Sequence, residues 1–491
     1  MILFRTALLI ILALAITSMA PTRAHAQIPI AGKTLTYRIA DSDSHQELYR
    51  TRMWETVDSN APAWLTLATF PNGANRFNEC VFANGYDRPA TSSRSILFSA
   101  SGELERKDFD TFDPTYYPFL SSTVSADMQP GSCLGKGGLN LATVLNGGKV
   151  GFQAWTDSGF IGLNFRREDA ETLNLPAGRF DAIRIGVDVD LGRLFPHMPA
   201  LVLKLFTPTV KFWITKTEPF YILKMVGLGD GGSKHPHTVI ELASIEDPSA
   251  KDSSALAEVH QGDSLPQDPT FALANSGSFV QGERSGHITM SSATVPEGMM
   301  VDAKISYTDG IVIENRELID HRAQPPARYI EDRTFSRDGS VKRRHQLFFR
   351  SAAFPTEPEK TFPSDLYGAD MTLGMVLPGL VPEVSDTTVF HVMDWYGQVN
   401  ELEIRRDGET TVPVGSAEAS AIHCKLKPRV EVPILLRPIA YFLIPSFDLD
   451  FDANPGHRVL KVEGPFGPPG APVAHMIGDE KIPSVATTAA K

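Results

Sequence analysis

One short segment carries residues that could perform chemistry on a sugar. Phe390–Gly397 places Asp394 directly before Trp395 and Tyr396. An aromatic ring beside a carboxylate suits a glycosidase site, because the ring stacks on the sugar and the acid protonates the glycosidic oxygen. The same residues also suit an ordinary strand end that meets a turn. Glycoside hydrolysis needs a second carboxylate, which the sequence does not locate, so Asp394 is a catalytic candidate without an assigned partner.

Three other patterns resemble chemical motifs, but each is better explained as an ordinary structural feature without a functional role. The aspartates that alternate along Asp448–Asp452 have the spacing of a calcium loop, but apolar residues stand between them. That alternation predicts a strand with its aspartates on one exposed face. His235-Pro-His237 lacks nearby residues that would complete a zinc site. Gly262–Leu265 spells an esterase motif but lies in a polar stretch and does not follow an apolar strand. We therefore expect no metal and no cofactor.

Two apolar stretches bracketed by proline, Pro196–Pro208 and Pro433–Pro445, are the other functional candidates. Both are too short to cross a membrane. Each could cover the open side of a curved sheet and present apolar side chains to a ligand, or could simply close the core. Burial of each large apolar side chain contributes about 1.5–3 kcal/mol in either case, so energetics do not separate the two interpretations. The predicted ligand-lining residues are Leu201, Leu203, Leu205, Phe206, Trp213, Ile439, Tyr441 and Phe442.

The elements that must position these residues are predicted to be β-strands. Segments such as Phe180–Asp190 alternate apolar and polar residues, which is the period of a half-buried strand. Ser101-Gly102 and Asp338-Gly339 suit tight turns between strands. The 36 prolines and 38 glycines interrupt the chain too often for long helices. We predict an all-β fold with minor helix, built as two tandem related antiparallel half-barrel or curved-sheet domains.

An internal repeat at an offset of 237 residues supports two domains. Phe98–Arg106 matches Phe335–Arg343, and Leu223–Gly227 matches Leu460–Gly464. Pro176-Ala-Gly178 aligns with Pro413-Val-Gly415 at the same offset. Matches at one offset over a long range indicate a duplication. The predicted organisation is a signal peptide at 1–26, a first β domain at 27–246, a linker at 247–276, a second β domain at 277–480 and a disordered tail at 481–491.

The N-terminus, charge and cysteines indicate an exported protein. Arg5, a short apolar run and the Ala24-His-Ala26 end predict a secretory signal that is cleaved after Ala26. The apolar run is too short to span a bilayer, so we expect no transmembrane segment in the mature chain and a periplasmic or secreted location. The formal net charge of −12 disfavours nucleic acid as a partner. An oxidising compartment would allow a Cys80–Cys133 disulfide, while Cys424 is expected to be an inert core thiol.

One family shares part of this pattern. Leu175–Arg184, with Phe212–Pro219 and Leu223-Lys224 downstream, resembles the exported family called domain of unknown function 3108. Pro413–Glu418 and Asp450–Pro455 in the second half match the same pattern more loosely. The resemblance implies a periplasmic antiparallel sheet curled into a half-barrel, similar in outline to lipoprotein carriers. It implies no enzymatic activity.

Three functions remain open on the sequence alone. The leading hypothesis is a non-catalytic periplasmic binding or carrier protein for a lipid or other amphiphile. The second is a polysaccharide- or envelope-acting hydrolase that uses Asp394. The third is a scaffold that pairs sheet edges with an envelope protein partner.

Overall fold

The described part of the chain folds almost entirely into β-strands, as predicted. The computed structural model describes residues 33–58, 61–82, 90–112, 128–130, 144–145, 147, 149–156, 159–190, 210–217, 221–228, 238–248, 269–320, 327–350, 366–367, 377, 387–393, 399–429, 446–465 and 473–479. Within these ranges, helical residues are limited to 144–145 and 377. None of the described helical residues forms a helix long and apolar enough to cross a membrane.

The first thirteen strands make up the first half of the structure. They are β1 (Thr34–Asp41), β2 (Glu47–Asp58), β3 (Ala61–Thr69), β4 (Asn75–Val81), β5 (Ser92–Phe98), β6 (Leu104–Phe112), β7 (Met128–Pro130), β8 (Lys149–Thr156), β9 (Gly159–Leu175), β10 (Gly178–Asp190), β11 (Val210–Thr215), β12 (Ile222–Leu228) and β13 (Thr238–Glu246).

The remaining strands make up the second half. They are β14 (Ala272–Gln281), β15 (Arg284–Val295), β16 (Gly298–Tyr307), β17 (Val312–Ile319), β18 (Ala327–Phe335), β19 (Val341–Phe349), β20 (Leu366–Tyr367), β21 (Thr387–Met393), β22 (Val399–Val414), β23 (Ala417–Pro428), β24 (Phe447–Asp452), β25 (Val459–Pro465) and β26 (Val473–Gly478). β14 begins inside the predicted linker 247–276, and the division of the chain into domains stays a prediction.

Strand pairing follows the same order in both halves. In the first half, β1 to β6 form consecutive antiparallel pairs, β8 to β13 do the same, and β13 pairs with β1. In the second half, β14 to β19 and β21 to β26 repeat this arrangement, and β26 pairs with β14. The short strands β7 and β20 each add a parallel edge, beside β8 and β21. The correspondence supports the duplication.

The repeat offset holds for most strands and shifts in one hairpin. β2 and β15, β6 and β19, β11 and β24, and β12 and β25 begin 237 residues apart. The two-residue loop Pro176-Ala177 of the β9–β10 hairpin instead corresponds to Gly415-Ser416 of β22–β23, because Leu175 pairs with Gly178 and Val414 pairs with Ala417. The alignment of Pro176 with Pro413 is therefore wrong by two residues.

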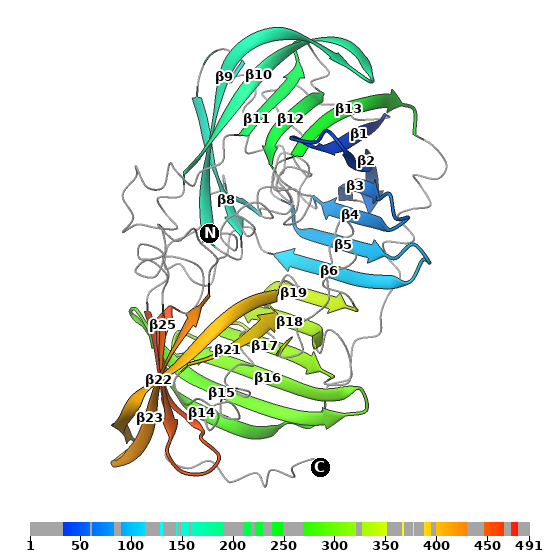
Figure 1. Ribbon diagram of the computed structural model, residues 1–491. Coiled ribbons are helices and arrows are strands. Elements are labelled where there is room, and N and C mark those ends of the chain that lie inside the picture. The colour runs from blue at the N-terminus through cyan, green and yellow to red at the C-terminus, as the bar shows by residue number, and fades with distance from the viewer. Residues whose placement is uncertain are drawn as a thin grey trace.

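The two halves meet along β6 and β19, which are equivalent strands. They pair antiparallel, and Figure 1 shows them side by side between the upper first half and the lower second half. Phe109 pairs with Gln346, the residue 237 positions later. An antiparallel pair in which a residue faces its own repeat equivalent has a local pseudo-twofold axis at that point. The junction therefore has the geometry of a symmetric dimer contact within one chain.

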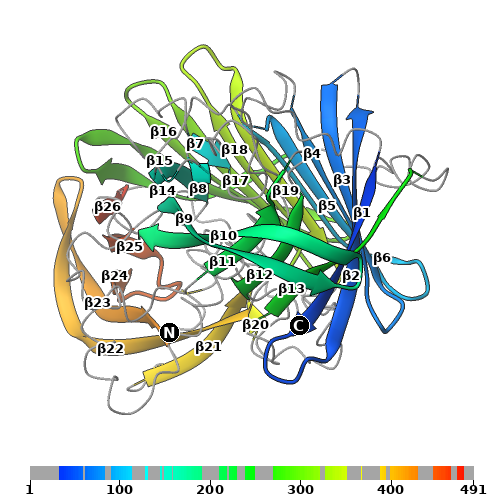
Figure 2. The same cartoon turned by 90° about the horizontal axis from the view of Figure 1, so that it is seen from above.

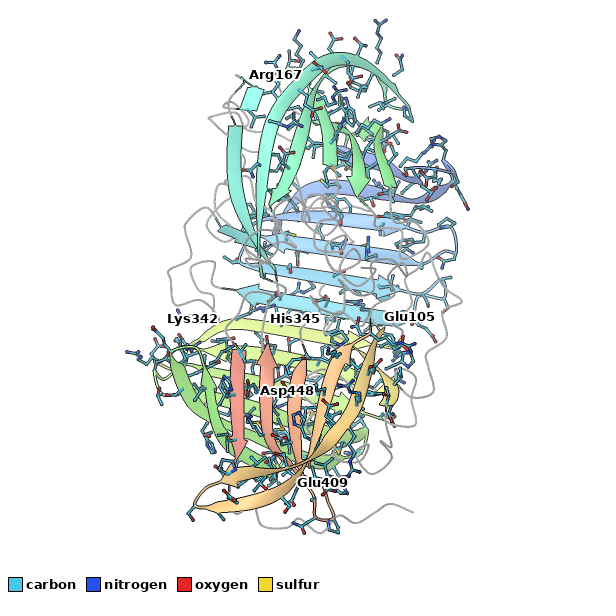
Figure 3. All side chains as sticks on the ribbon, turned by 60° about the vertical axis from the view of Figure 1, so that its left-hand side comes forward. Glu105, Arg167, Lys342, His345, Glu409 and Asp448 are labelled. Atoms are coloured by element: carbon cyan, nitrogen blue, oxygen red, sulfur yellow. The ribbon has the colours of Figure 1, made fainter. Side chains whose placement is uncertain are left out.

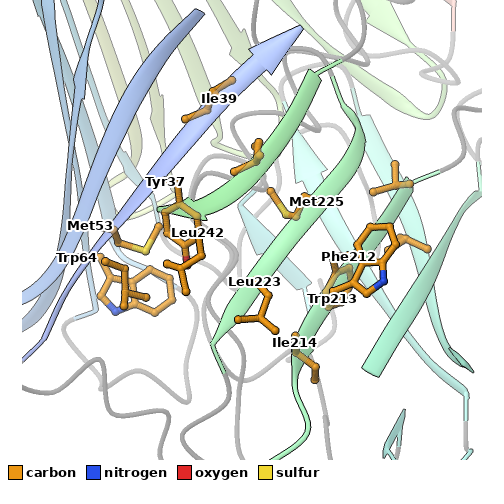
Figure 4. Close-up of a cluster of buried hydrophobic side chains, with 14 of the residues drawn as sticks. Tyr37, Ile39, Met53, Trp64, Phe212, Trp213, Ile214, Leu223, Met225 and Leu242 are labelled. Carbon is orange, nitrogen blue, oxygen red and sulfur yellow. The ribbon is translucent and has the colours of Figure 1, made fainter. Parts of the chain in front are cut away.

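Each half curves around its own apolar core. The first core combines side chains from β1–β5, such as Ile39 and Trp64, with others from β9–β13, such as Phe212 and Leu242 (Figure 4). The second core combines Phe279, Ile305 and Phe451 with their neighbours. Viewed from above, the strands curve around the interior and do not lie in a flat layer (Figure 2). We call the face of the strands that carries these cores the inner face.

Candidate functional site

Most predicted site residues lie outside the described part of the chain, and their roles stay predictions. These are Leu201, Leu203, Leu205, Phe206, Ile439, Tyr441 and Phe442 of the apolar stretches, the catalytic candidate Asp394, and Cys133 of the predicted disulfide.

Trp213 is described, and it lies on β11 among charged residues. Its cross-strand partners are Arg184 and Lys224, so it points to the opposite face from its neighbours Phe212 and Ile214. The indole is 9% exposed, and its Nε1 donates a hydrogen bond to Glu171 Oε1 at 2.7 Å. Trp213 also belongs to the first apolar core, so a ligand that contacts it would meet both that core and these charged neighbours.

The two described cysteines are both buried. Cys80 lies on β4 with 7% exposure, and its pairing with Cys133 stays a prediction. Cys424 lies on β23, fully buried and not in a disulfide. Burial raises the pKa of the Cys424 thiol to about 11, so the thiolate is disfavoured at neutral pH. The register makes it equivalent to the core residue Ile185, because the two pair with Leu449 and Phe212.

The aspartates of β24 do not all lie on an exposed face, which corrects the prediction. Asp450 is 5% exposed, and its Oδ1 lies 2.7 Å from Nδ1 of His423 on the neighbouring β23. A hydrogen-bonded partner on the next strand makes the burial of this carboxylate tolerable. The described residues contain no group of three or more His, Cys, Asp or Glu side chains arranged to hold a metal ion.

A row of cross-strand neighbours on the inner face is the candidate site, and we call it the inner row. In the first half it runs Met53, Thr66, Asn78, Ser95 and Asp108 on β2 to β6. In the second half it runs Met290, Ala303, Asn315, Asp332 and His345 on β15 to β19. Each residue of the second list stands 237 positions after its counterpart in the first. Met53 and Met290 belong to the two apolar cores, which places the row on the inner face.

The first half of the inner row is hydrogen bonded through Asn78. Its Nδ2 donates to Thr66 Oγ1 at 2.9 Å, and its Oδ1 accepts from Ser95 Oγ at 2.7 Å. Thr66 is 6% exposed, while Asn78 and Ser95 are half-buried, so this network is partly shielded from water. Both ends of the Asn78 amide have partners, which is how a shielded polar group is normally accommodated.

The second half of the inner row keeps the asparagine but changes its neighbours. Asn315 pairs in register with Ala303 and Asp332, where Asn78 pairs with Thr66 and Ser95. Asn315 is 3% exposed, and its Nδ2 has no hydrogen-bond partner in the structure described. An uncompensated buried amide costs roughly 1–3 kcal/mol. The second half therefore holds a buried donor without a hydrogen-bond partner, whereas the equivalent donor in the first half is hydrogen bonded.

The centre of the inner row links the two halves through charged groups. His345 Nε2 lies 2.8 Å from Asp108 Oδ1, and Arg343 Nη2 lies 3.3 Å from Asp110 Oδ2. His345 is 4% exposed and lies where the halves meet (Figure 3). Asp108 and His345 occupy equivalent positions in the repeat and are diagonal neighbours across the junction, so divergence has placed an acid within hydrogen-bond distance of a base. Like charges at such a pseudo-symmetric contact would repel.

The outer face of the same strands carries a separate ion-pair network. Arg316 Nε lies 3.2 Å from Asp302 Oδ1, and Arg333 Nη2 lies 2.6 Å from Glu314 Oε2. Burial, followed by the nearby Glu314 carboxylate, raises the pKa of Asp302 above its ordinary value. This network lies on the same strands as the inner row, on the opposite face of the sheet.

Sequence reasoning missed the inner row, although its signal was present. The offset of 237 aligns Asn78 with Asn315 and Thr66 with Ala303 directly in the sequence. What the sequence does not show is that these positions are cross-strand neighbours, because register depends on pairing between strands that are distant along the chain.

Comparisons with known proteins identify no family. No family model matches the chain, and no curated protein matches it. Among solved structures, it is similar to a putative lipoprotein from Parabacteroides distasonis (9% identity, TM-score 0.21, covering 44% of this chain and 95% of that one). It is also similar to a β-barrel-like protein of domain of unknown function 1849 from Brucella abortus (10% identity, TM-score 0.24, covering 44% of this chain and 98% of that one). A third similar structure is MucB (9% identity, TM-score 0.19, covering 66% of this chain and 89% of that one). These likenesses carry no argument about function, and the resemblance to domain of unknown function 3108 stays a prediction.

Proposed function

We propose that the protein is an exported, non-catalytic carrier that binds a lipid or other amphiphile against the inner faces of its curved sheets. The predicted signal sequence, residues 1–26, supports export to the periplasm or the medium. The carrier role is supported mainly by two long apolar connections that occur at equivalent places in the two halves.

The connections join strands that lie side by side. β10 and β11 are hydrogen-bonded antiparallel neighbours, and so are their equivalents β23 and β24. A hairpin of this kind needs only about 2–5 residues, yet residues 191–209 and 429–446 separate the strands. Both connections contain the proline-bracketed apolar stretches. Long connections kept in both halves of a compact protein are commonly functional.

The strands that flank these connections contribute to the apolar cores. Ile185 of β10 and Phe212 of β11 belong to the first core, and Leu426 of β23 and Phe451 of β24 belong to the second. An acyl chain bound against these surfaces would lose contact with water at a gain of about 0.8 kcal/mol for each buried CH₂ group. The arrangement therefore favours a ligand with a long apolar part.

The test is binding of cis-parinaric acid, a fluorescent fatty acid, to delipidated mature protein. The Leu203→Asp and Tyr441→Asp variants each place a charge in one connection and should weaken binding, while their melting temperatures stay near that of the wild type. Val473→Asp on β26 is the matched control and should bind normally, because Val473 is 48% exposed and lies on the opposite face from the core residues Ala474 and Met476 of the same strand. Native mass spectrometry of freshly purified protein should show a co-purifying amphiphile. Absence of both probe binding and bound amphiphile would contradict the proposal.

A further inference from the structure

We propose that the junction between the two halves is a pH-sensitive contact, which protonated His345 strengthens and neutral His345 loosens. The inference goes beyond the carrier function and does not depend on it, because it concerns how the halves are held together and not what they bind. It rests on a buried histidine that faces carboxylates on the strand pair joining the halves.

The junction is held by backbone and polar contacts, and neither apolar core extends across it. β6 and β19 form seven antiparallel residue pairs, from Arg343 with Phe112 to Phe349 with Arg106. Among the described residues, the first and second cores include no side chain of either strand. Two domains that share no apolar core are free to move relative to each other unless other contacts hold them. The strength of the junction is therefore sensitive to its charged pairs.

His345 faces carboxylates from both neighbouring strands. It is 4% exposed, and its Nε2 lies 2.8 Å from Oδ1 of Asp108 on β6. In the strand register it pairs with Asp110 of β6 and with Asp332 of β18. Residues that pair across adjacent strands lie on the same face of the sheet, so the three carboxylates and His345 form one cluster on the inner face. Figure 3 shows His345 at the level where the halves meet.

Two arginines compensate part of the negative charge of this cluster. Arg106 Nη2 lies 3.6 Å from Asp108 Oδ2. Arg343 lies 3.3 Å from Asp110 Oδ2 through Nη2 and 3.9 Å from Asp332 Oδ2 through Nη1. The three carboxylates nearest to His345 thus face two guanidinium groups. Protonation of the histidine supplies the third positive charge and balances the cluster.

The balance sets the direction of the pH effect. Glu317 of β17 and Arg328 of β18 lie further from His345 in the register and carry one charge of each sign. Burial opposes a charged histidine, but a buried charge is tolerated when it is paired. Neutral His345 can still donate to Asp108, yet a charge-assisted hydrogen bond is about twice as strong as a neutral one. Raising the pH through the range in which histidine loses its proton, ordinarily near about 6.5, should therefore weaken the junction.

The test is hydrogen–deuterium exchange of the mature protein at about pH 6 and about pH 8, corrected for the intrinsic exchange rate. Protection of β6 and β19 should fall about five- to tenfold at the higher pH, which is the difference between a hydrogen bond to a charged group and a neutral one. β3 and β4 are the internal reference and should change little. His345→Gln keeps a hydrogen-bonding side chain that does not titrate, so it should abolish the fall.

Two further variants control for the position of the titrating group. His423→Gln is the matched control, because His423 Nδ1 lies 2.7 Å from Asp450 Oδ1 on the adjacent strand but within the second half, away from the junction. This variant should keep the wild-type fall. Asp108→Asn leaves His345 in place and removes its nearest carboxylate, so it should reduce the fall even where His345→Gln does not fold.

The inference is overturned by equal protection of β6 and β19 at the two pH values in the wild type. A fall of wild-type size in His345→Gln or in Asp108→Asn also overturns it, as does loss of the fall in His423→Gln, because the titrating group then lies elsewhere. These measurements involve no ligand, so failure of the carrier function leaves their outcome unchanged.

Discussion

The two equivalent asparagines should respond in opposite directions to the same substitution. Replacing Asn78 with Leu removes hydrogen bonds to Thr66 and Ser95, each with a net value of about 1 kcal/mol, and leaves Thr66 buried without this donor. A loss of roughly 2–3 kcal/mol follows. Replacing Asn315 with Leu keeps a similar side-chain volume and removes an unpartnered buried amide, which should stabilise the ligand-free protein by roughly 1–2 kcal/mol.

Differential scanning calorimetry on ligand-free protein measures the contrast. For a domain of roughly 150–250 residues, a change of about 1 kcal/mol in the free energy of unfolding shifts the transition midpoint by about 2–4 °C. Asn315→Leu should therefore raise the midpoint by roughly 4 °C, and Asn78→Leu should lower it by roughly 8 °C. If Asn315→Leu destabilises the protein as much as Asn78→Leu does, the reasoning about the open donor is refuted. Circular dichroism of both variants controls for loss of the β fold.

Three further predictions concern the cysteines and one buried carboxylate. Cys424, with its pKa raised to about 11, should not react with a thiol reagent at pH 7 until the protein is unfolded, and fast labelling of the native protein would contradict this. The predicted Cys80–Cys133 bond closes a long loop and should contribute about 4 kcal/mol, so reduction should lower the melting temperature, whereas free thiols at both positions in exported protein would refute the pairing. Asp302, whose pKa is raised by burial and then by Glu314, binds its proton more tightly in the folded state. Its contribution to stability should therefore decline as the pH rises from the pKa of Asp302 in the unfolded state through its pKa in the folded state. Asp302→Asn should remove this pH dependence of stability. A carbon-13 titration that places Asp302 below the ordinary value would contradict this.

Local patterns were sufficient to predict the strands. The alternation along Phe180–Asp190 predicted a strand that the structure places at Gly178–Asp190. The turns at Gly102 and Gly339 have positive φ values of 82° and 80°, which glycine adopts readily. These features depend on residues close together in sequence, so the sequence reports them directly.

Features that depend on pairing between distant strands were not predictable. The sequence repeat aligned Pro176 with Pro413, but the hairpin register shifts this match by two residues. The burial of Asp450 depends on His423 of another strand, which alternation alone does not reveal. The junction of β6 with β19 likewise follows from which sheet edges meet. These are tertiary choices that no local period encodes.

The most direct test of the carrier function is photo-crosslinking with a fatty acyl probe that carries a diazirine near the chain end, read out by peptide sequencing. We expect competable crosslinks to the apolar connections and to inner-face residues such as Met290 and Ile305. Crosslinks confined to outer-face residues such as Val473, or labelling that excess unlabelled fatty acid does not reduce, would contradict it.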